Sequence, residues 1–356
     1  MNSAIQAAEN ILVETRGKAG LIRLNRPRAI NSLTLPMVLD FSQALSRFER
    51  AQETVCVIVA GEGERGLCAG GDVRIIHDLG KANDPDLLRF WREEFPLNYR
   101  IAHFSKPYVA LMDGIVMGGG VGISAHGSHR IVTERTRLAM PETGIGYFPD
   151  VGATWLLPKA PGECGTWLGL TGNTVLAADA IYAGLADWFV LSSQLPDLVQ
   201  ELTGVAHQDD VEDVILKYAG DAGESVLEAN SGKFDAAFRY NTVEEIIEAL
   251  RKNDDTFSHE TLEALQKRSP TSLKLTLRLL RMGRESSSLM ECLEREFSAG
   301  AEVLRQHDFY EGVRAAIVDK DRNPHWSPAT LADVTEDHIR AYLDKQDVRL
   351  FPDHRL

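Results

Sequence analysis

Short apolar runs alternate with one amphipathic helix over the first 60 residues. The runs 11–13 and 20–24 predict two strands, and the polar residues 14–19 between them predict the turn of a hairpin. Apolar side chains recur at helical spacing over 35–50, which predicts a helix. The unbroken apolar run 55–60 predicts a buried strand. The chain therefore begins as an α/β protein.

A similar alternation continues to about residue 140, with glycine-rich turns between the elements. Short strands separated by helices and glycine turns indicate a layered α/β architecture. The expected elements are a glycine-rich loop at 61–72, a helix at 84–103, a strand at 108–112, a helix at 118–126 and strands near 129–133 and 137–139.

The character of the chain changes past residue 185, where glycine thins out and amphipathic helices dominate. Ser269 followed by Pro270 predicts a helix start, because serine caps helices and proline suits their first turn. The expected domains are a core at 1–200 and a helical C-terminal region at 201–356, with an insertion at about 208–255 and closing and assembly helices at about 256–350.

Charge and hydropathy exclude two classes of partner. Of the 356 residues, 38 are basic and 52 acidic, which gives a net charge of −14. This acidic balance, without a local basic patch, argues against a nucleic-acid partner. No run approaches the roughly 18 apolar residues that a membrane-spanning helix needs, so no membrane partner is expected.

Cysteine usage and the first residues bear on the compartment. The four cysteines, at positions 56, 68, 164 and 292, are scattered without CxxC spacing or interleaved histidines. They predict reduced thiols in a cytosol-like compartment, with neither a disulfide framework nor a metal site. The start of the chain lacks a charged and apolar leader, which favours a cytoplasmic location, although a trimmed mature protein would look the same.

Two glycine-rich stretches each follow a predicted strand. Glycines in 66–73 allow backbone N–H groups to approach a ligand, although a tight loop between a strand and a helix would look the same. In 113–122, three consecutive glycines lead into a helix and leave N–H groups available to an anion. Residues 120–125 also fit a dinucleotide-binding pattern, but Glu134 comes too early and Glu142 lies outside any strand, so this match is weak.

A third stretch, 140–152, holds two carboxylates among apolar, glycine and proline residues. Acidic side chains in such surroundings are usually either helix caps or catalytic groups with raised pKa values. Asp150 could cap a helix that begins after it, and Glu142 could occupy a first helical turn. The residues alone leave capping and catalysis both open.

Taken together and in this order, the three stretches resemble the crotonase (enoyl-CoA hydratase/isomerase) superfamily, and within it the 3-hydroxyisobutyryl-CoA hydrolase branch. The resemblance implies an α/β fold, a spiral of ββα units with a helical C-terminal region, and a core at 1–200 that binds coenzyme A thioesters. The matching segments are 68–72 (CAGGD), 118–120 (GGG), 140–152 (MPETGIGYFPDVG), 92–94 (REE), 269–274 (SPTSLK), 307–315 (HDFYEGVRA), 319–321 (DKD) and 324–326 (PHW).

The resemblance also implies a site. The backbone N–H groups of Gly71 and Gly119 would form an oxyanion hole for the thioester carbonyl. Glu142 would act as the base that activates water or as the nucleophile that forms an anhydride, and the sequence does not choose between them. Asp150 would bond the substrate β-hydroxyl or orient Glu142. Glu94 would contact the substrate, unless it is a solvated glutamate on a helix surface.

One departure from the hydratases is informative. Hydratases of this superfamily carry one glutamate on the helix after the triple glycine and a second at the position of Glu142. The first of these positions is Gly122 here, so the rate of hydration of an enoyl thioester should be strongly reduced.

The expected function is hydrolysis of a short 3-hydroxyacyl-CoA in valine catabolism, with 3-hydroxyisobutyryl-CoA ahead of 3-hydroxypropionyl-CoA. The alternatives are an enoyl-CoA isomerase or hydratase of the same fold and a non-catalytic acyl-CoA-binding protein. No cofactor is expected beyond the coenzyme A of the substrate. The resemblance points to a homo-oligomer, a trimer or hexamer, but the C-terminal half is longer than in simple hydratases and leaves the state open.

Overall fold

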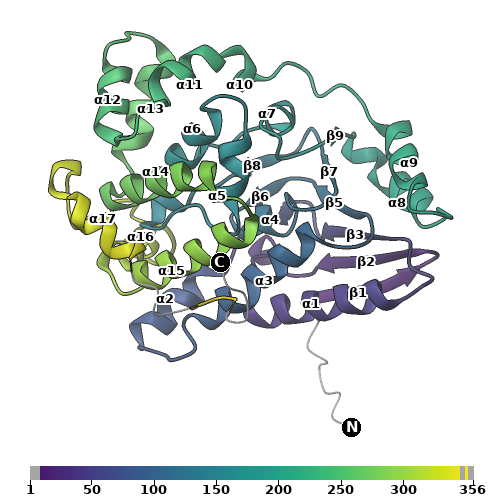
Figure 1. The fold of residues 1–356 in the computed structure, drawn as a ribbon. Coiled ribbons are helices and arrows are strands. Elements are labelled where there is room, and N and C mark those ends of the chain that lie inside the picture. Colours follow the sequence, from purple (N-terminus) through teal and green to yellow (C-terminus); the bar gives the residue numbers. More distant parts are fainter. Residues whose placement is uncertain (1–8, 345–348, 352–356) are drawn as a thin grey trace.

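The strands of the protein form two sheets in the computed structural model, which describes residues 9–344 and 349–351 (Figure 1). The larger sheet has the order β1-β2-β3-β5-β7-β9 and the smaller one β4-β6-β8. All neighbouring strands are parallel except the antiparallel pair β1 and β2. The strands are β1 (Ile11–Arg16), β2 (Ala19–Leu24), β3 (Cys56–Gly61), β4 (Gly66–Cys68), β5 (Tyr108–Met112), β6 (Ile115–Met117), β7 (His129–Val132), β8 (Arg137–Ala139) and β9 (Trp188–Phe189).

Helices connect and cover these strands. The α-helices are α1 (Leu35–Arg50), α2 (Val73–Lys81), α3 (Arg89–Ala102), α4 (Gly119–Gly122), α5 (Ala153–Leu156), α6 (Cys164–Thr171), α7 (Ala177–Tyr182), α8 (Leu195–Leu202), α9 (Asp210–Tyr218), α10 (Val226–Ala229), α11 (Ser231–Phe238), α12 (Val243–Arg251), α13 (Thr256–Gln266), α14 (Pro270–Glu285), α15 (Leu289–Val303), α16 (His307–Val313) and α17 (Glu336–Leu343).

The elements that the local pattern predicts most directly are confirmed. The hairpin, the helix at 35–50 and the strand at 108–112 all form, although the hairpin strands extend so far that only Gly17 and Lys18 remain as the turn. The helix expected at 118–126 is shorter, because α4 is a single turn that ends at Gly122. A run of glycines has low helix propensity, which explains the early end.

Successive strands pass alternately between the two sheets. The pairs β3 and β4, β5 and β6, and β7 and β8 each place their first strand in the larger sheet and their second in the smaller one. Where the chain crosses after β5, Gly114 has φ +69°, and a Cβ atom on it would fall 2.7 Å from the Cα atom of Gly66. Only glycine fits such a close approach. The expected spiral of ββα units is therefore confirmed.

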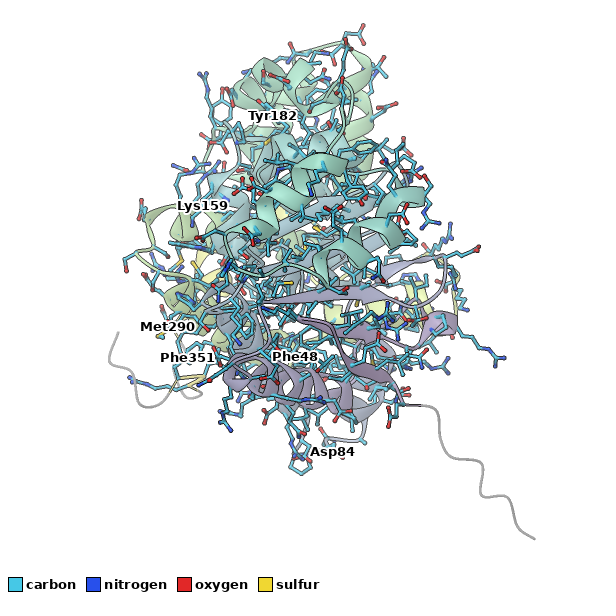
Figure 2. The ribbon with its side chains drawn as sticks, turned by 90° about the vertical axis from the view of Figure 1, so that its right-hand side faces the viewer. Phe48, Asp84, Lys159, Tyr182, Met290 and Phe351 are labelled. Atoms are coloured by element: carbon cyan, nitrogen blue, oxygen red, sulfur yellow. The ribbon has the colours of Figure 1, made fainter. Side chains whose placement is uncertain are left out.

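Two apolar layers enclose the larger sheet. On one face, α1 packs against β1, β2 and α3, and its Phe48 is fully buried (Figure 2). The Phe48 ring lies so near β2 that a Cβ atom on Gly20 would fall 2.5 Å from it. Leucine and valine side chains of α8 and α9 cover the opposite face. Burial on both faces is what continuous apolar strands require.

The helices from α9 to α13 lie in different environments. Helix α9 packs on the larger sheet beside α8, whereas α11, α12 and α13 gather around α6 and α14 with an apolar cluster of their own (Figure 1). Arg281 of α14 pairs with Glu163 at 3.0 Å and donates to the carbonyl oxygens of Phe238 and Tyr240. This arginine therefore ties helices together. The segment expected as one insertion, 208–255, contains helices from both environments, and the boundary near residue 200 stays a prediction.

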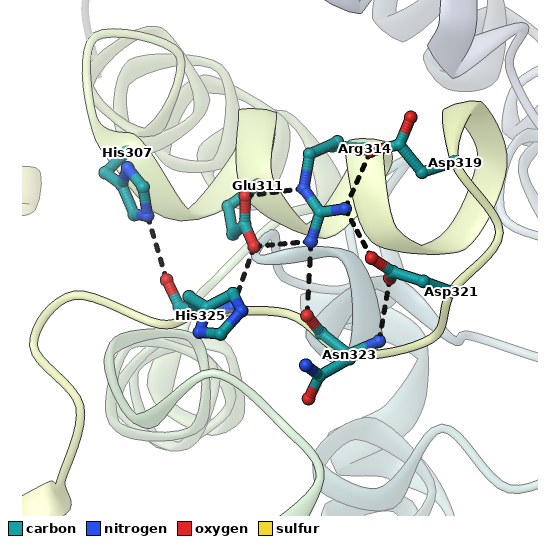
Figure 3. A network of polar contacts seen from close by, with 7 residues as sticks. All are labelled: His307, Glu311, Arg314, Asp319, Asp321, Asn323 and His325. Atoms are coloured by element: carbon teal, nitrogen blue, oxygen red, sulfur yellow. Dashed lines mark hydrogen bonds and ion pairs between the residues drawn. The ribbon is translucent and has the colours of Figure 1, made fainter.

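Arg314 fixes the chain after α16 (Figure 3). It begins a π-helix, η5 (Arg314–Val318), whose Ile317 lines the cavity described below. π-Helical turns are uncommon and need support from their surroundings. The guanidinium of Arg314 contacts the carboxylates of Glu311 at 2.8 Å, Asp319 at 2.8 Å and Asp321 at 2.7 Å, and the carbonyl oxygen of Asn323 at 3.1 Å.

No helix within the described ranges is long and apolar enough to cross a membrane. All four cysteines are buried and none forms a disulfide.

The predicted helix start at Ser269 is confirmed, and it provides a test of the fold. Ser269 is fully buried, accepts a hydrogen bond from the Ser272 N–H at 3.1 Å and donates to Oδ2 of Asp308 at 2.5 Å. Ser269→Ala removes the cap and leaves a buried carboxylate with one partner fewer. We expect a loss of about 2–3 kcal/mol in the free energy of unfolding, measured by chemical denaturation.

Thr242 is the matched control, because it caps α12 at an exposed position by accepting from the Glu245 N–H. Thr242→Ala should cost about 1 kcal/mol, the usual value for a lost cap. Equal losses for the two variants would show that the Asp308 contact adds nothing.

Candidate active site

The smaller sheet brings the three sequence stretches together. Strand β4 ends immediately before residues 69–71, β6 before 118–119, and β8 before 140–142. These three strands are adjacent and parallel, in the order β4-β6-β8. The carboxyl ends of adjacent parallel strands meet at one edge of a sheet, which is where ligands bind in open α/β folds. Topology therefore gathers stretches that lie far apart along the chain.

The backbones of Gly71 and Gly119 lie side by side. Leu33 forms an isolated β-bridge with Gly71. The Leu33 N–H donates to the Gly70 carbonyl oxygen and the Asp72 N–H donates to the Leu33 carbonyl oxygen, each at 2.8 Å, so this bridge does not use the Gly71 N–H. Gly119 is the first residue of α4, whose N–H has no acceptor within the helix. A Cβ atom on Gly119 would lie 3.4 Å from the Gly71 nitrogen. The two backbone segments therefore lie close enough for the N–H groups to serve one oxygen atom, as the resemblance implies.

The glycines also leave space for carboxylates. A Cβ atom on Gly118, whose φ is +50°, would fall 2.8 Å from Oε1 of Glu142. A Cβ atom on Gly119 would fall 2.6 Å from Oε1 of Glu94. Both glutamates therefore reach the backbone of the glycine turn, and a side chain at either glycine would displace them.

Three carboxylates line one cavity. Glu94, Glu142 and Asp150 are 2%, 8% and 6% exposed, and they border a cavity of about 180 Å³ together with the two glycine turns. The rest of its wall is mainly apolar and aromatic, with Ile76, Phe90, Trp91, Ile145, Tyr147 and Phe309. The predicted residues Gly71, Glu94, Gly119, Glu142 and Asp150 thus all meet in one place.

Hydrogen bonding leaves acceptor atoms of this site unused. The Trp91 indole N–H donates to Oδ2 of Asp150 at 2.9 Å. Within the described part of the chain, Oε1 of Glu94 and Oε2 of Glu142 are buried without a hydrogen-bond partner. Buried polar atoms are nearly always paired in native proteins, so unpaired atoms beside a cavity indicate a ligand site.

Burial raises the pKa of all three carboxyl groups. It raises the pKa of Asp150 to about 7, although the bond from Trp91 acts in the opposite direction. Burial raises the pKa of Glu142 well above its ordinary value, and the charge of Asp150 raises it further. The pKa of Glu94 rises for the same reasons, with burial first and the charges of Asp150 and Glu142 after it. Carboxyl groups shifted in this way can exchange protons near neutral pH.

The structure decides two alternatives that the sequence leaves open. Glu94 is not a solvated glutamate, because it lies inside the cavity, while its neighbour Arg92 donates outward to the Arg349 carbonyl oxygen at 3.0 Å. Asp150 is not a helix cap, because α5 begins at Ala153 with Gly152 in the capping position. Glu142 does occupy the first turn of a short helix, η2 (Glu142–Ile145), but its side chain is buried in the cavity.

Gly122 has no space for a side chain. A Cβ atom there would fall 2.7 Å from Cβ of Val151 and 2.8 Å from Nδ2 of Asn98. Real Cβ atoms do not approach other atoms so closely, so a glutamate at this position requires its neighbours to move. With Val151 and Asn98 in these positions, the site therefore has no space for the second carboxylate of a hydratase.

Sequence reasoning missed Trp91, which holds Asp150. The only available signal was its position three residues before Glu94, since residues three apart share a helix face. Cys68, beside the oxyanion turn, is fully buried, and burial raises the pKa of its thiol to about 12, which suits a packed and unreactive thiol. Among the described residues, no cluster of histidine, cysteine, aspartate or glutamate could hold a metal ion.

Known proteins give the family of this chain. Residues 19–343 match the family model described as enoyl-CoA hydratase/isomerase. The chain is 42% identical to the mitochondrial 3-hydroxyisobutyryl-CoA hydrolases of Gallus gallus, over 94% of this chain and 88% of that one, and of Homo sapiens, over 95% and 89%. A solved structure from Mycobacterium thermoresistibile, described as a carnitinyl-CoA dehydratase, superposes with a TM-score of 0.92 at 41% identity, over 97% of this chain and 100% of that one. The fold, the converging glycine turns and these matches agree that the chain belongs to the enoyl-CoA hydratase/isomerase family.

Proposed function

We propose that this protein hydrolyses the thioester of a short 3-hydroxyacyl-CoA, first of all 3-hydroxyisobutyryl-CoA, to give 3-hydroxyisobutyrate and coenzyme A in valine catabolism. The observation that carries this proposal is Glu142, which is buried beside the backbones of Gly71 and Gly119 in a site where Gly122 leaves no space for the additional glutamate that hydratases carry at that position. The relatives at 42% identity that are named 3-hydroxyisobutyryl-CoA hydrolases support the choice of acyl group.

The backbone donors carry the electrostatic part of the reaction. The carbonyl oxygen of the thioester accepts hydrogen bonds from the N–H groups of Gly71 and Gly119, and these bonds strengthen as negative charge develops on that oxygen. Removal of one such donor costs about 10²–10³ in rate in other enzymes. Because the donors are preorganised by the strand ends, they need not reorient during the reaction.

Glu142 carries the proton or the acyl group, by one of two routes. In the first, it takes a proton from water, the water oxygen bonds to the carbonyl carbon, the carbon–sulfur bond breaks, and the leaving thiolate receives that proton from Glu142. In the second, a Glu142 oxygen bonds to the carbonyl carbon, the thiolate leaves, and water opens the resulting anhydride. Both routes need the ionised carboxylate.

Asp150 and Glu94 suit the 3-hydroxyl group of the substrate. Asp150 is held at one oxygen by Trp91, and the unpaired Oε1 of Glu94 lies beside Gly119. A substrate hydroxyl would supply the hydrogen bond that the buried Oε1 of Glu94 lacks, and it could also reach the Asp150 carboxyl group. The cavity of about 180 Å³ is smaller than the roughly 300–1,000 Å³ of sites for drug-sized ligands, which favours a short acyl chain.

One comparison favours a second candidate. The solved structure at 41% identity is described as a dehydratase, so a carbon–oxygen lyase or an isomerase that uses Glu142 alone is the alternative reaction. A binding protein without catalysis is disfavoured, because binding of the 3-hydroxyl group would engage Asp150 and Glu94 and leave the costly burial of Glu142 without a purpose. Two further expectations stay predictions: a homo-oligomer, as a trimer or hexamer, and an activity without a cofactor. A cytoplasmic location also stays a prediction, since the relatives named above are mitochondrial proteins.

The first test offers the protein 3-hydroxyisobutyryl-CoA and, separately, crotonyl-CoA. We expect release of free thiol from the first and no loss of the enoyl chromophore of the second. Glu142→Gln should lower kcat for thiol release by about 10²–10⁴-fold, because it removes the group that takes the proton or the acyl group.

Glu260→Gln, which changes an exposed glutamate of α13, is the control and should leave kcat unchanged. Chromophore loss without thiol release would instead establish a hydratase. Full thiol release by Glu142→Gln would remove Glu142 from the mechanism.

The pH dependence follows from the raised pKa of Glu142. Because the ionised form reacts, kcat should fall as pH decreases through this raised pKa, above the ordinary glutamate range near 4.5. The charge of Asp150 contributes to the shift. Asp150→Asn should therefore move the acid limb of the kcat profile to lower pH, besides lowering the maximum. An acid limb that stays in place would show that another group controls it.

A further inference from the structure

The turn that follows Asp150 has an uncommon backbone. Val151 has φ +53° and Gly152 has φ +84°. The left-handed region is unfavourable for a β-branched residue such as valine, and such conformations persist only where the surroundings hold them. Something outside the turn must therefore hold the segment that carries Asp150.

Glu296 of α15 supplies such a hold. Its carboxylate is fully buried and accepts three hydrogen bonds, from the Gly152 N–H at 2.7 Å, the Thr154 N–H at 3.0 Å and the Thr154 hydroxyl at 2.5 Å. Burial raises the pKa of Glu296 to about 8, and the hydrogen bonds from Thr154 and Gly152 act in the opposite direction. The C-terminal helical region thereby reaches across to the turn beside the cavity.

His126 completes the support from the other side. Burial lowers the pKa of His126 to about 4, so the ring is neutral near pH 7, and its Nε2–H donates to the Val151 carbonyl oxygen at 2.7 Å. The Ala153 N–H closes the turn by donating to the Asp150 carbonyl oxygen at 2.8 Å. Between Asp150 and Thr154, the backbone is thus fixed by two side chains from distant elements.

We propose that Glu296 is a positioning residue of the active site. It holds the turn after Asp150 so that the Asp150 carboxyl group stays on the Trp91 indole and faces the cavity. This inference rests on the proposed function for the role of Asp150, but its geometry stands without that function. Three donors converge on the two oxygens of Glu296, so a residue with only one acceptor atom must leave at least one of them unpaired.

The test is a double-mutant cycle of Glu296→Gln and Asp150→Asn. The amide of glutamine has one oxygen, so one donor of the turn faces an N–H group and the turn shifts. In the wild-type background, we expect kcat for 3-hydroxyisobutyryl-CoA hydrolysis to fall about 10–100-fold, with a much smaller change in KM. In the Asp150→Asn background, Glu296→Gln should cause little further loss, because the two residues act together.

Glu294→Gln is the matched control. Glu294 lies on the same helix and also accepts two backbone hydrogen bonds, from the N–H groups of Leu350 and Phe351 at 2.8 and 2.9 Å, away from the cavity. This variant should leave kcat and KM unchanged. Equal falls in kcat caused by Glu296→Gln in both backgrounds would overturn the proposal, because a purely structural residue acts independently of Asp150.

A second readout does not depend on activity. In protein labelled with nitrogen-15 tryptophan, the indole N–H signal of Trp91, assigned through Trp91→Phe, reports its hydrogen bond to Asp150. We expect Glu296→Gln to move this signal and Glu294→Gln to leave it in place. A moved signal in a protein that hydrolyses no 3-hydroxyacyl-CoA would support the positioning role and refute the proposed function; an unmoved signal would refute the role.

Glu296→Asp covers the case in which the glutamine variant fails to fold. Aspartate keeps two acceptor oxygens on a shorter side chain, so it should retain more of kcat than glutamine and follow the same pattern in the cycle. A folded aspartate variant with additive effects and an unmoved Trp91 signal would again overturn the proposal.

Discussion

The parallel pairing of β4, β6 and β8 is the constraint on which the rest of this site depends. Each of these strands is only three residues long, yet each is followed at once by a functional segment. Side chains alternate between the faces of a strand, so a slip of one residue would turn Glu142 away and separate the two N–H donors. The larger sheet and its two covering layers serve to hold this small sheet in register.

The chemistry of the site depends on buried carboxyl groups that have few hydrogen-bond donors around them. Glu94, Glu142 and Asp150 are all buried, but among the described residues only Asp150 has a side-chain donor, the indole of Trp91. A buried carboxylate without donors is costly, and the protein lowers this cost by retaining protons, which is what the raised pKa values express. A ligand that brings a hydroxyl group into this cavity relieves part of the cost. Affinity for a hydroxylated acyl group and readiness for proton transfer thus have one origin.

The elements that could be predicted from the sequence are those that local pattern determines. The helix at 35–50, the strand at 108–112 and the cap at Ser269 follow from periodicity and capping, which need no knowledge of the fold. The resemblance carried by the glycine turns and the 140–152 stretch also named the five site residues that the fold brings together.

What the sequence could not show depends on contacts between distant segments. The burial of Glu94 results from α3 lying over the glycine turns, and nothing in its neighbours Arg92 and Glu93 indicates it. The start of α5 at Ala153, two residues later than an Asp150 cap would place it, accompanies the left-handed Val151 and Gly152. Periodicity cannot detect a support such as Glu296, because it acts on residues that lie more than 140 positions away.

The crowding at Gly122 limits how the reaction of such a chain can be changed. The two donors are backbone N–H groups, so an enzyme family can change its reaction by exchanging the acidic side chains around an unchanged oxyanion hole. Here, however, Val151 and Asn98 occupy the space that a side chain at Gly122 would need. A glutamate at this position requires its neighbours to move or to be replaced by smaller residues, and smaller neighbours without the glutamate would leave a cavity. A single substitution at Gly122 therefore does not convert this site into that of a hydratase.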